Sequence, residues 1–98
     1  MLRVGGEWVA PAEVEATIIE HPSVLEVAIV GELDDRGITR PVAYVVAKPG
    51  VVITESEVIE HCRNRLAGFK RPSRVVLMDE LPKTATGKIQ RFKLRQPA

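Results

Sequence analysis

Two apolar runs, separated by a polar stretch, constrain the fold more than any other feature of this sequence. Val24–Val30 reads VLEVAIV and Pro41–Lys48 reads PVAYVVAK. Both are rich in β-branched residues, which pack well on the pleated surface of a strand. The stretch between them, Gly31–Arg40, contains Asp-Asp-Arg-Gly and is typical of a turn. We therefore predict two strands that pair antiparallel through this turn.

Two amphipathic helices are predicted, one before and one after this pair of strands in the sequence. The first should begin at Pro11, which suits a first helical turn, and end near His21, because Pro22 cannot continue a helix. Val14 and Ile18 lie four residues apart on one face of it, and we expect that face to be buried.

A capping box indicates where the second helix starts. Thr54 and Glu57 stand three residues apart in the sequence TESE, the spacing at which two side chains cap a helix N-terminus. Gly68 predicts the end of this helix. Its apolar face should consist of Val58, Cys62 and Leu66.

Shorter segments complete the predicted fold. Leu2–Val4 and Trp8–Val9 read as extended pieces around a Gly5-Gly6 turn. Ser73–Asp79 reads as a third strand, and Ile89–Leu94 as a short helix. We expect one α+β domain over residues 1–98, in which helices flank a three-stranded sheet and a β-hairpin lies at the N-terminus.

Size, charge and cysteine content narrow the class of protein. The 98 residues suit one domain, and no apolar run approaches the roughly 20 residues that span a bilayer. The formal net charge of +1 predicts no general attraction to nucleic acid. A single cysteine, Cys62, excludes an internal disulfide and fits a reducing cytoplasm. We interpret Cys62, His21 and His61 as structural, and no metal-binding spacing is visible.

The charge is unevenly distributed along the chain. From Lys83 onward the sequence contains no acidic residue, which predicts an anionic partner for this end of the chain. The basic residues there are Lys83, Lys88, Arg91, Lys93 and Arg95.

The segment PKTATGKIQR, residues 82–91, is the strongest candidate for chemistry. Gly87 gives the backbone freedom beside Lys88, whose compact ammonium group suits a phosphate or a carboxylate. Thr84 and Thr86 add hydroxyl groups. The glycine and lysine spacing is not that of a P-loop. Taken alone, this segment also fits a solvated connector without function.

Three segments together resemble one protein family. They are GGEWVAPAEVE at residues 5–15, AGFKRPSRV at residues 67–75 and the lysine segment at residues 82–91. In this order they resemble the C-terminal domain of the adenylate-forming enzymes, the acyl-CoA and aryl-CoA ligase superfamily. The segments EWVAPAEVE and ELPKTATGKIQRFKLR together are most similar to benzoate-CoA ligase and related aromatic-acid CoA ligases.

The resemblance implies a two-step reaction. A carboxylic acid reacts with ATP to give an acyl-adenylate and pyrophosphate, and the thiol of coenzyme A then displaces AMP. In this family the small C-terminal domain rotates between the steps and presents first its lysine loop, then its glycine hairpin. ATP, Mg²⁺ and the acid are expected on the protein's own large N-terminal adenylation domain, which lies outside this sequence. The chain alone should therefore be inactive and hold no cofactor tightly.

Lys88 matches the catalytic lysine of the family. The resemblance implies that it bridges the carboxylate and the phosphate while negative charge shifts between them. Lys83, Thr84, Thr86 and Gly87 would complete the loop that binds ATP and the adenylate. The resemblance also suggests a lysine acetyltransferase as a partner, because acetylation of Lys88 would remove its charge.

The N-terminal hairpin matches the segment that lines the pantetheine tunnel in the thioester-forming step. Its residues are Arg3, Gly5, Gly6, Glu7 and Trp8. Many relatives carry lysine in place of Arg3 and serine in place of Gly5. Relatives often have serine in place of Ala10, where it would cap the helix. The alternatives are an ordinary turn at Gly5-Gly6 and core packing of Trp8.

A third segment, Phe69-Lys70-Arg71, matches residues that in some relatives meet the adenine and phosphates of coenzyme A. Stacking combined with positive charge suits a nucleotide. The alternative is that Phe69 seals the core and the two cations are solvated.

Three other functions remain open on the sequence. One is the adenylation module of a peptide synthetase, whose acceptor is a carrier-protein thiol. Another is a stand-alone module that binds an anion through the basic segment. The last is a purely structural domain. The acid that is activated does not follow from these residues.

Overall fold

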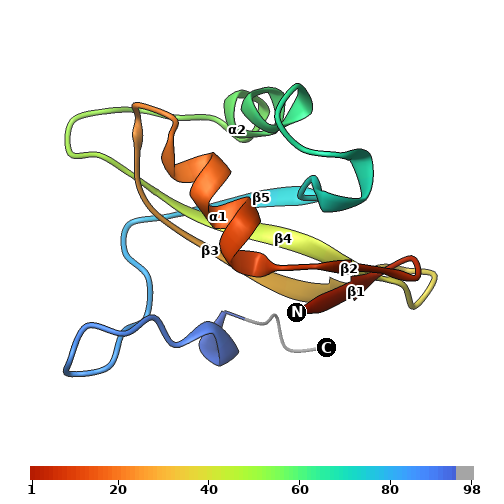
Figure 1. The fold of residues 1–98 in the computed structure, drawn as a ribbon. Coiled ribbons are helices and arrows are strands. Elements are labelled where there is room, and N and C mark those ends of the chain that lie inside the picture. Colours follow the sequence, from red (N-terminus) through yellow and green to blue (C-terminus); the bar gives the residue numbers. More distant parts are fainter. Residues whose placement is uncertain (95–98) are drawn as a thin grey trace.

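A three-stranded sheet forms the centre of the fold (Figure 1). The computed structural model describes residues 1–94. The strands are β3 (Val24–Leu33), β4 (Thr39–Ala47) and β5 (Arg74–Met78), in that order across the sheet. β3 and β4 pair antiparallel, and β4 and β5 pair parallel. The predicted antiparallel pair and the predicted third strand are confirmed.

Both faces of the sheet are covered, the upper face in Figure 1 by the helices and the lower face by the segment after β5. Successive residues of a strand point to opposite faces. Along β3, Val27 and Ile29 pack with the helices, whereas Ala28 and Val30 pack in a second core that includes Leu81. β4 is the central strand, and its residues 41–46 are continuously buried because neither face of the strand meets water.

Helices α1 (Pro11–Ile19) and α2 (Glu55–Arg63) lie on the same face of the sheet. Val14 and Ile18 are fully buried, as their spacing predicts. α1 ends at Ile19 rather than at His21, because the His21 amide donates to the Ile18 carbonyl, 3.0 Å away, and closes a turn.

The predicted cap of α2 is present, but its predicted end is wrong. Thr54 Oγ1 accepts a hydrogen bond from the Glu57 amide at 3.2 Å, as a capping residue should. The helix ends at Arg63, well before Gly68. Two successive amides beyond Arg63 both donate to the Cys62 carbonyl, so the backbone turns away from the helix axis there.

The turn between β3 and β4 is shorter than the predicted Gly31–Arg40. Asp34 Oδ1 accepts from the amides of Arg36 and Ile38, both at 2.9 Å. These bonds close the turn within residues 34–38, so both strands extend into the predicted turn. The Ile38 amide is also the main reason that the pKa of Asp34 is lowered.

Short elements complete the described chain. β1 (Leu2–Val4) and β2 (Glu7–Val9) form the predicted antiparallel hairpin. The 3₁₀ helices are η1 (Gly68–Lys70) and η2 (Arg91–Lys93), and η2 takes the place of the longer helix predicted over Ile89–Leu94. Within residues 1–94, no helix is long and apolar enough to cross a membrane.

The missing N-cap of α1 gives a stability prediction. Ala10 occupies the cap position with extended backbone angles, and no side chain caps the helix. Ala10→Ser places a hydroxyl near the Glu13 amide, so the free energy of unfolding in urea should rise by about 1 kcal/mol. Ala12→Ser puts the same hydroxyl inside the first turn and is the control, with no expected gain. Equal effects of the two variants would contradict the capping argument.

Candidate functional site

The lysine segment is an internally bonded hairpin rather than a free connector. The Thr84 amide donates to the Lys88 carbonyl at 2.8 Å, and the Gly87 amide donates to the Thr84 carbonyl at 2.9 Å. Lys83 and Ile89 face each other as an antiparallel bridge below the turn. Thr84 Oγ1 accepts from the Lys88 amide at 3.1 Å. Four of the segment's residues therefore fix the position of the Lys88 backbone.

Gly87 is required by the geometry of this turn. Its φ of 88° lies in the left-handed region, which side chains strongly disfavour. Thr86 supports the same turn, because its hydroxyl lies 3.0 Å from that of Thr84. The two threonine hydroxyls thus bond to each other and help to hold the turn.

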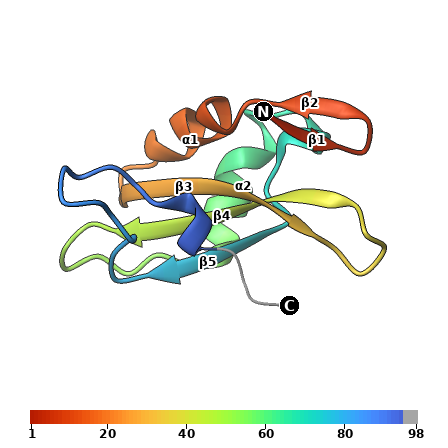
Figure 2. The ribbon, with the colours of Figure 1, turned by 90° about the horizontal axis from the view of Figure 1, so that it is seen from below.

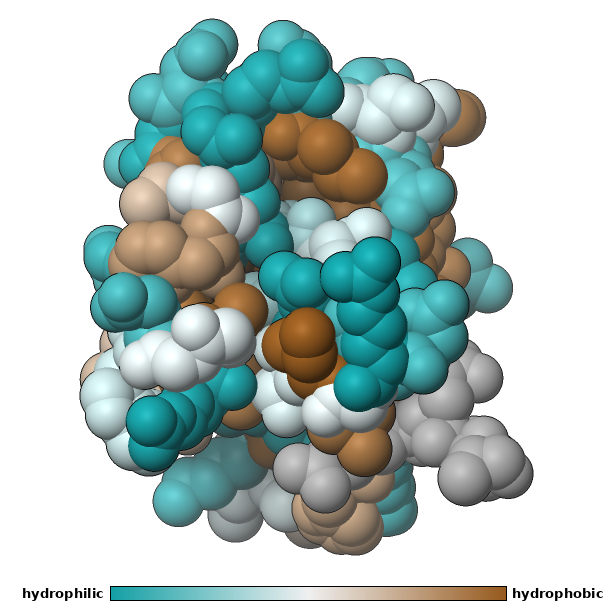
Figure 3. All heavy atoms as spheres, turned by 90° about the vertical axis from the view of Figure 1, so that its right-hand side faces the viewer, coloured by the Kyte–Doolittle hydropathy of each residue, from teal (hydrophilic) through white to brown (hydrophobic). Residues whose placement is uncertain are grey.

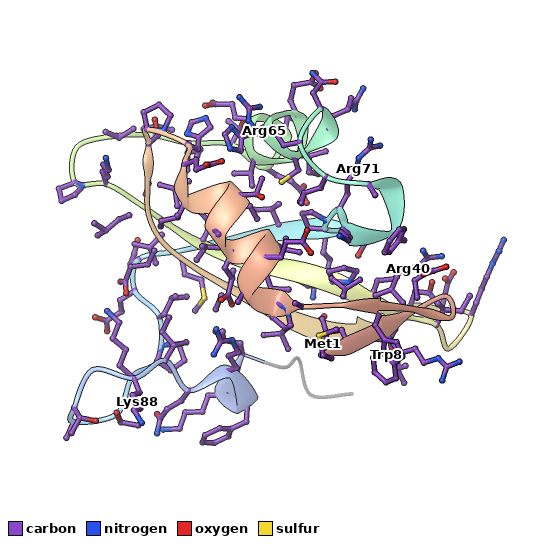
Figure 4. The ribbon with its side chains drawn as sticks, viewed as in Figure 1. Met1, Trp8, Arg40, Arg65, Arg71 and Lys88 are labelled. Atoms are coloured by element: carbon purple, nitrogen blue, oxygen red, sulfur yellow. The ribbon has the colours of Figure 1, made fainter. Side chains whose placement is uncertain are left out.

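Lys88 is the free cation of this hairpin. It is exposed, and its ammonium group has no carboxylate partner among residues 1–94. Figure 4 shows it in the lysine segment, apart from the sheet. An ammonium group in this position can reach an anion outside the domain.

Two other cations of the basic segment have acidic partners within the domain. Lys83 forms an ion pair with Glu26, and Arg91 forms one with Glu15. The positive charge of this end is therefore smaller than its residue count suggests. Arg95 lies outside the described residues.

The N-terminal hairpin presents a different set of groups. Gly5 and Gly6 both have positive φ, 54° and 90°, and form its tight turn. Arg3 and Trp8 are opposite each other in the register, and the guanidinium carbon lies 5.6 Å from the indole centroid. Glu7 is exposed beside them.

The interpretation of Trp8 as a core residue is wrong. Trp8 is 57% exposed, whereas Val9 is fully buried. Alternation along β2 allows only one of two neighbours to face the core, and the smaller valine does so. Figure 4 shows Trp8 on the outside of the hairpin, where its ring is available to a partner.

The structure places the third candidate segment beside this hairpin, because η1, which contains Phe69 and Lys70, contacts β2. Phe69 is 36% exposed and does not seal the core. The two cations are not simply solvated. Lys70 Nζ lies 2.9 Å from Glu13 Oε2.

Arg71 has a structural role that the sequence did not reveal. Its Nε donates to the Leu66 carbonyl at 3.0 Å, and its Nη2 donates to the Arg63 carbonyl at 2.7 Å. The guanidinium group thus satisfies the last carbonyl of α2, where positive charge is favoured, and one carbonyl of the turn that follows (Figure 4).

The lysine segment and the N-terminal hairpin of β1 and β2 lie at opposite ends of the domain in both ribbon views (Figures 1 and 2). The domain extends 38 Å along its longest axis. In the view onto the hairpin end, hydrophobic side chains reach the surface in separate places among hydrophilic ones (Figure 3). Two surfaces of different chemistry are therefore available, and one small reacting group cannot touch both at once.

Sequence reasoning missed the role of Glu15. We assigned no function to it, but it accepts a hydrogen bond from the Ile29 amide at 2.8 Å and also binds Arg91. The partners lie far from it along the chain, so no local motif could have indicated these contacts.

His61 joins the two helices, and His21 closes the turn after α1. His61 Nε2 lies 2.8 Å from the Thr17 carbonyl, and His21 Nδ1 accepts from the Ser23 amide at 3.1 Å. Their rings meet edge to face with centroids 5.2 Å apart. Among residues 1–94, no three His, Cys, Asp or Glu side chains are grouped so as to hold a metal ion.

Comparison with known proteins places these features in a family. The model of the AMP-binding enzyme C-terminal domain matches residues 13–88. The chain belongs to this family.

Its relatives in this family are named as CoA ligases. Benzoate–CoA ligase of Thauera aromatica is 48% identical over 98 residues, which cover 97% of this chain and 19% of that protein. The peroxisomal trans-cinnamate:CoA ligase of Petunia hybrida is 42% identical over 94 residues, which cover 96% of this chain and 16% of that protein. This chain thus spans about a fifth of the length of the curated relatives it matches.

Solved structures share the fold. The anthranilate CoA ligase AuaEII in complex with anthranoyl-AMP matches with a TM-score of 0.90 and 47% identity, over 96% of this chain and 19% of that one. ATP-bound MatB from Rhodopseudomonas palustris matches with a TM-score of 0.91 and 34% identity, over 97% of this chain and 19% of that one. The predicted superfamily and α+β fold are confirmed.

The environment of Cys62 gives a second prediction. Cys62 is fully buried, and burial raises the pKa of its thiol above the ordinary value, which keeps it protonated near neutral pH. The folded chain should react with a thiol reagent such as DTNB at pH 7.5 at least about tenfold more slowly than the chain unfolded in urea. A folded chain that reacts as fast as the unfolded one would contradict the buried position.

Proposed function

We propose that residues 1–98 form the C-terminal mobile domain of an AMP-forming carboxylic acid–CoA ligase that acts on benzoate or a related aromatic acid. The observation that carries the proposal is the exposed Lys88, which directly follows an ordered turn and has no carboxylate partner among residues 1–94, in a chain of this family. Similarity to a benzoate–CoA ligase and an anthranilate CoA ligase, at 48% and 47% identity, supports the aromatic acid.

In the proposed adenylation step, Lys88 bridges the acid's carboxylate and the α-phosphate of ATP. Its ammonium group neutralises charge that moves from the attacking oxygen to the phosphate and the leaving pyrophosphate. Thr84, Thr86 and Gly87 hold the backbone that carries it. Lys83 supports the loop through Glu26, so a direct contact of Lys83 with ATP would require that ion pair to open.

In the proposed thioester step, the hairpin end of the domain faces the acyl-adenylate. Gly5 and Gly6 leave room for the pantetheine arm beside Arg3, Glu7 and Trp8. Phe69 and Lys70 would meet the nucleotide part of coenzyme A, and Arg71 supports this role because it fixes their segment to α2. The opposite positions of Lys88 and the hairpin suit a domain that turns between the two steps.

The rest of the proposed reaction needs groups outside this chain. A Mg²⁺ ion that accompanies ATP would bind to the N-terminal adenylation domain, together with ATP and the acid. Because the reaction needs that domain, we expect the isolated C-terminal domain to be inactive. Lys88 is exposed and has no carboxylate partner within residues 1–94, which also makes it accessible to an acetyltransferase that would remove its charge.

The acceptor thiol distinguishes the main alternative, a peptide-synthetase adenylation module. The similar proteins are named as CoA ligases, which favours free coenzyme A over a carrier protein.

A substitution of Lys88 in the full-length natural chain tests the proposal. With benzoate and ATP, Lys88→Ala should reduce pyrophosphate release by about 10²- to 10³-fold, because one preorganised charge at the transition state is lost. Thioester formation from supplied benzoyl-adenylate and coenzyme A should fall far less.

The control is Lys93→Ala, which removes a lysine of the same end that lies over the Phe92 ring and has no carboxylate partner in residues 1–94. This variant should release pyrophosphate at nearly the wild-type rate. Full adenylation activity of Lys88→Ala would refute the catalytic role.

A further inference from the structure

Two ion pairs hold the flanks of the lysine hairpin. Before the turn, Lys83 binds Glu26 of β3, and after it, Arg91 binds Glu15 of α1. We propose that Glu15 and Glu26 are positioning residues, which set the direction in which the hairpin presents Lys88 during adenylation. This inference rests on the proposed function of Lys88.

Glu15 is the stronger of the two anchors. Its Oε2 accepts from Arg91 Nη2 at 2.7 Å and its Oε1 accepts from the same nitrogen at 2.8 Å. Arg91 Nε adds a bond to Oε2 at 3.2 Å. The Glu15 side chain is only 16% exposed, so its charge is well shielded from competing water.

The same carboxylate also binds the sheet. Glu15 Oε2 accepts from the Ile29 amide at 2.8 Å. In the described sheet β3 is an edge strand, and its Ile29 amide donates to a side chain outside the sheet. One side chain of α1 therefore joins three segments: the helix, the edge of the sheet and the base of the lysine hairpin.

Glu26 acts on the other flank of the hairpin. It belongs to β3, and its side chain is 23% exposed. A lysine ammonium group lacks the planar fork of arginine, so this pair fixes direction less strictly than the pair at Arg91. We therefore expect Glu26 to contribute less than Glu15.

Apolar contacts alone do not determine the direction of the hairpin. Leu81, Ile89 and Leu94 attach this segment to the second core. Such contacts are not directional, so they hold the segment on the sheet but allow it to tilt. The two ion pairs are directional and lie at both ends of a turn that is rigid within itself. Together they leave Lys88 a narrow range of positions relative to the sheet.

Position matters because the proposed catalysis depends on one charge. A misplacement of about 1 Å can reduce a rate by as much as about 10²-fold. An error in the direction of this hairpin should affect adenylation but not thioester formation, because the hairpin of Gly5 and Gly6 lies at the other end of the domain.

Glu15→Gln in the full-length natural chain tests the inference. The amide oxygen can still accept from Ile29, but the charge that holds Arg91 is lost. We expect pyrophosphate release with benzoate and ATP to fall at least about tenfold. Thioester formation from supplied benzoyl-adenylate should stay within about twofold of wild type. Amide hydrogen exchange at Thr84, Gly87 and Lys88 should become faster.

Matched variants separate positioning from general stability. Glu26→Gln should also slow pyrophosphate release and leave thioester formation nearly unchanged, but the loss of pyrophosphate release should be smaller than in Glu15→Gln. Arg91→Lys keeps the positive charge but loses the paired hydrogen bonds to Glu15. Its rate of pyrophosphate release should lie between those of the wild type and Glu15→Gln. Glu60→Gln removes an ion pair with Arg63 whose acid is 64% exposed, and it should change neither step nor the exchange rates.

Two results would overturn the inference. One is unchanged pyrophosphate release and unchanged exchange in Glu15→Gln. The other is an equal loss in both steps with a lowered unfolding midpoint, which indicates a merely structural role. A wild-type chain that releases no pyrophosphate would instead refute the proposed function, and the exchange rates would then decide alone whether Glu15 orders the hairpin.

Discussion

Burial of both faces of a three-stranded sheet is the constraint on which the rest of this structure depends. Without the segment after β5, the side chains of Val30, Val42 and Tyr44 would face water. The chain therefore returns across the sheet after its last strand, and this return carries the lysine hairpin. The catalytic candidate is thus part of the covering layer, and its attachment to the sheet also completes the second core.

The same architecture separates two surfaces of different chemistry. The N-terminal hairpin offers a glycine turn, an indole ring and an adjacent cation, whereas the other end offers the exposed ammonium group of Lys88. A rigid sheet connects the two ends. In the proposed function, rotation of this body exchanges one surface for the other without any change inside the domain.

The sequence predicted the elements well and their limits less well. β-Branched runs, Pro11 and the Thr54 cap each act locally, so strands and helix starts could be placed from short patterns. The end of α2 depends on turn bonds to the Cys62 carbonyl, and the exposure of Trp8 depends on which neighbour faces the core. For the candidate site, the motif singled out Lys88 as a hypothesis, but it could not indicate the pair of Glu15 and Arg91, which are 76 residues apart and meet only in the tertiary fold.

The internal order of the lysine segment limits how Lys88 can move. Glycine and threonine suggest a flexible loop, but here Gly87 satisfies a left-handed turn and Thr84 bonds the Lys88 amide. Ion pairs hold both flanks of this turn. A loop held in this way does not withdraw on its own without breaking several directional bonds at once. If Lys88 must leave the reacting centre before coenzyme A attacks, the whole domain has to carry it away, and the hinge for that motion must lie outside the lysine segment.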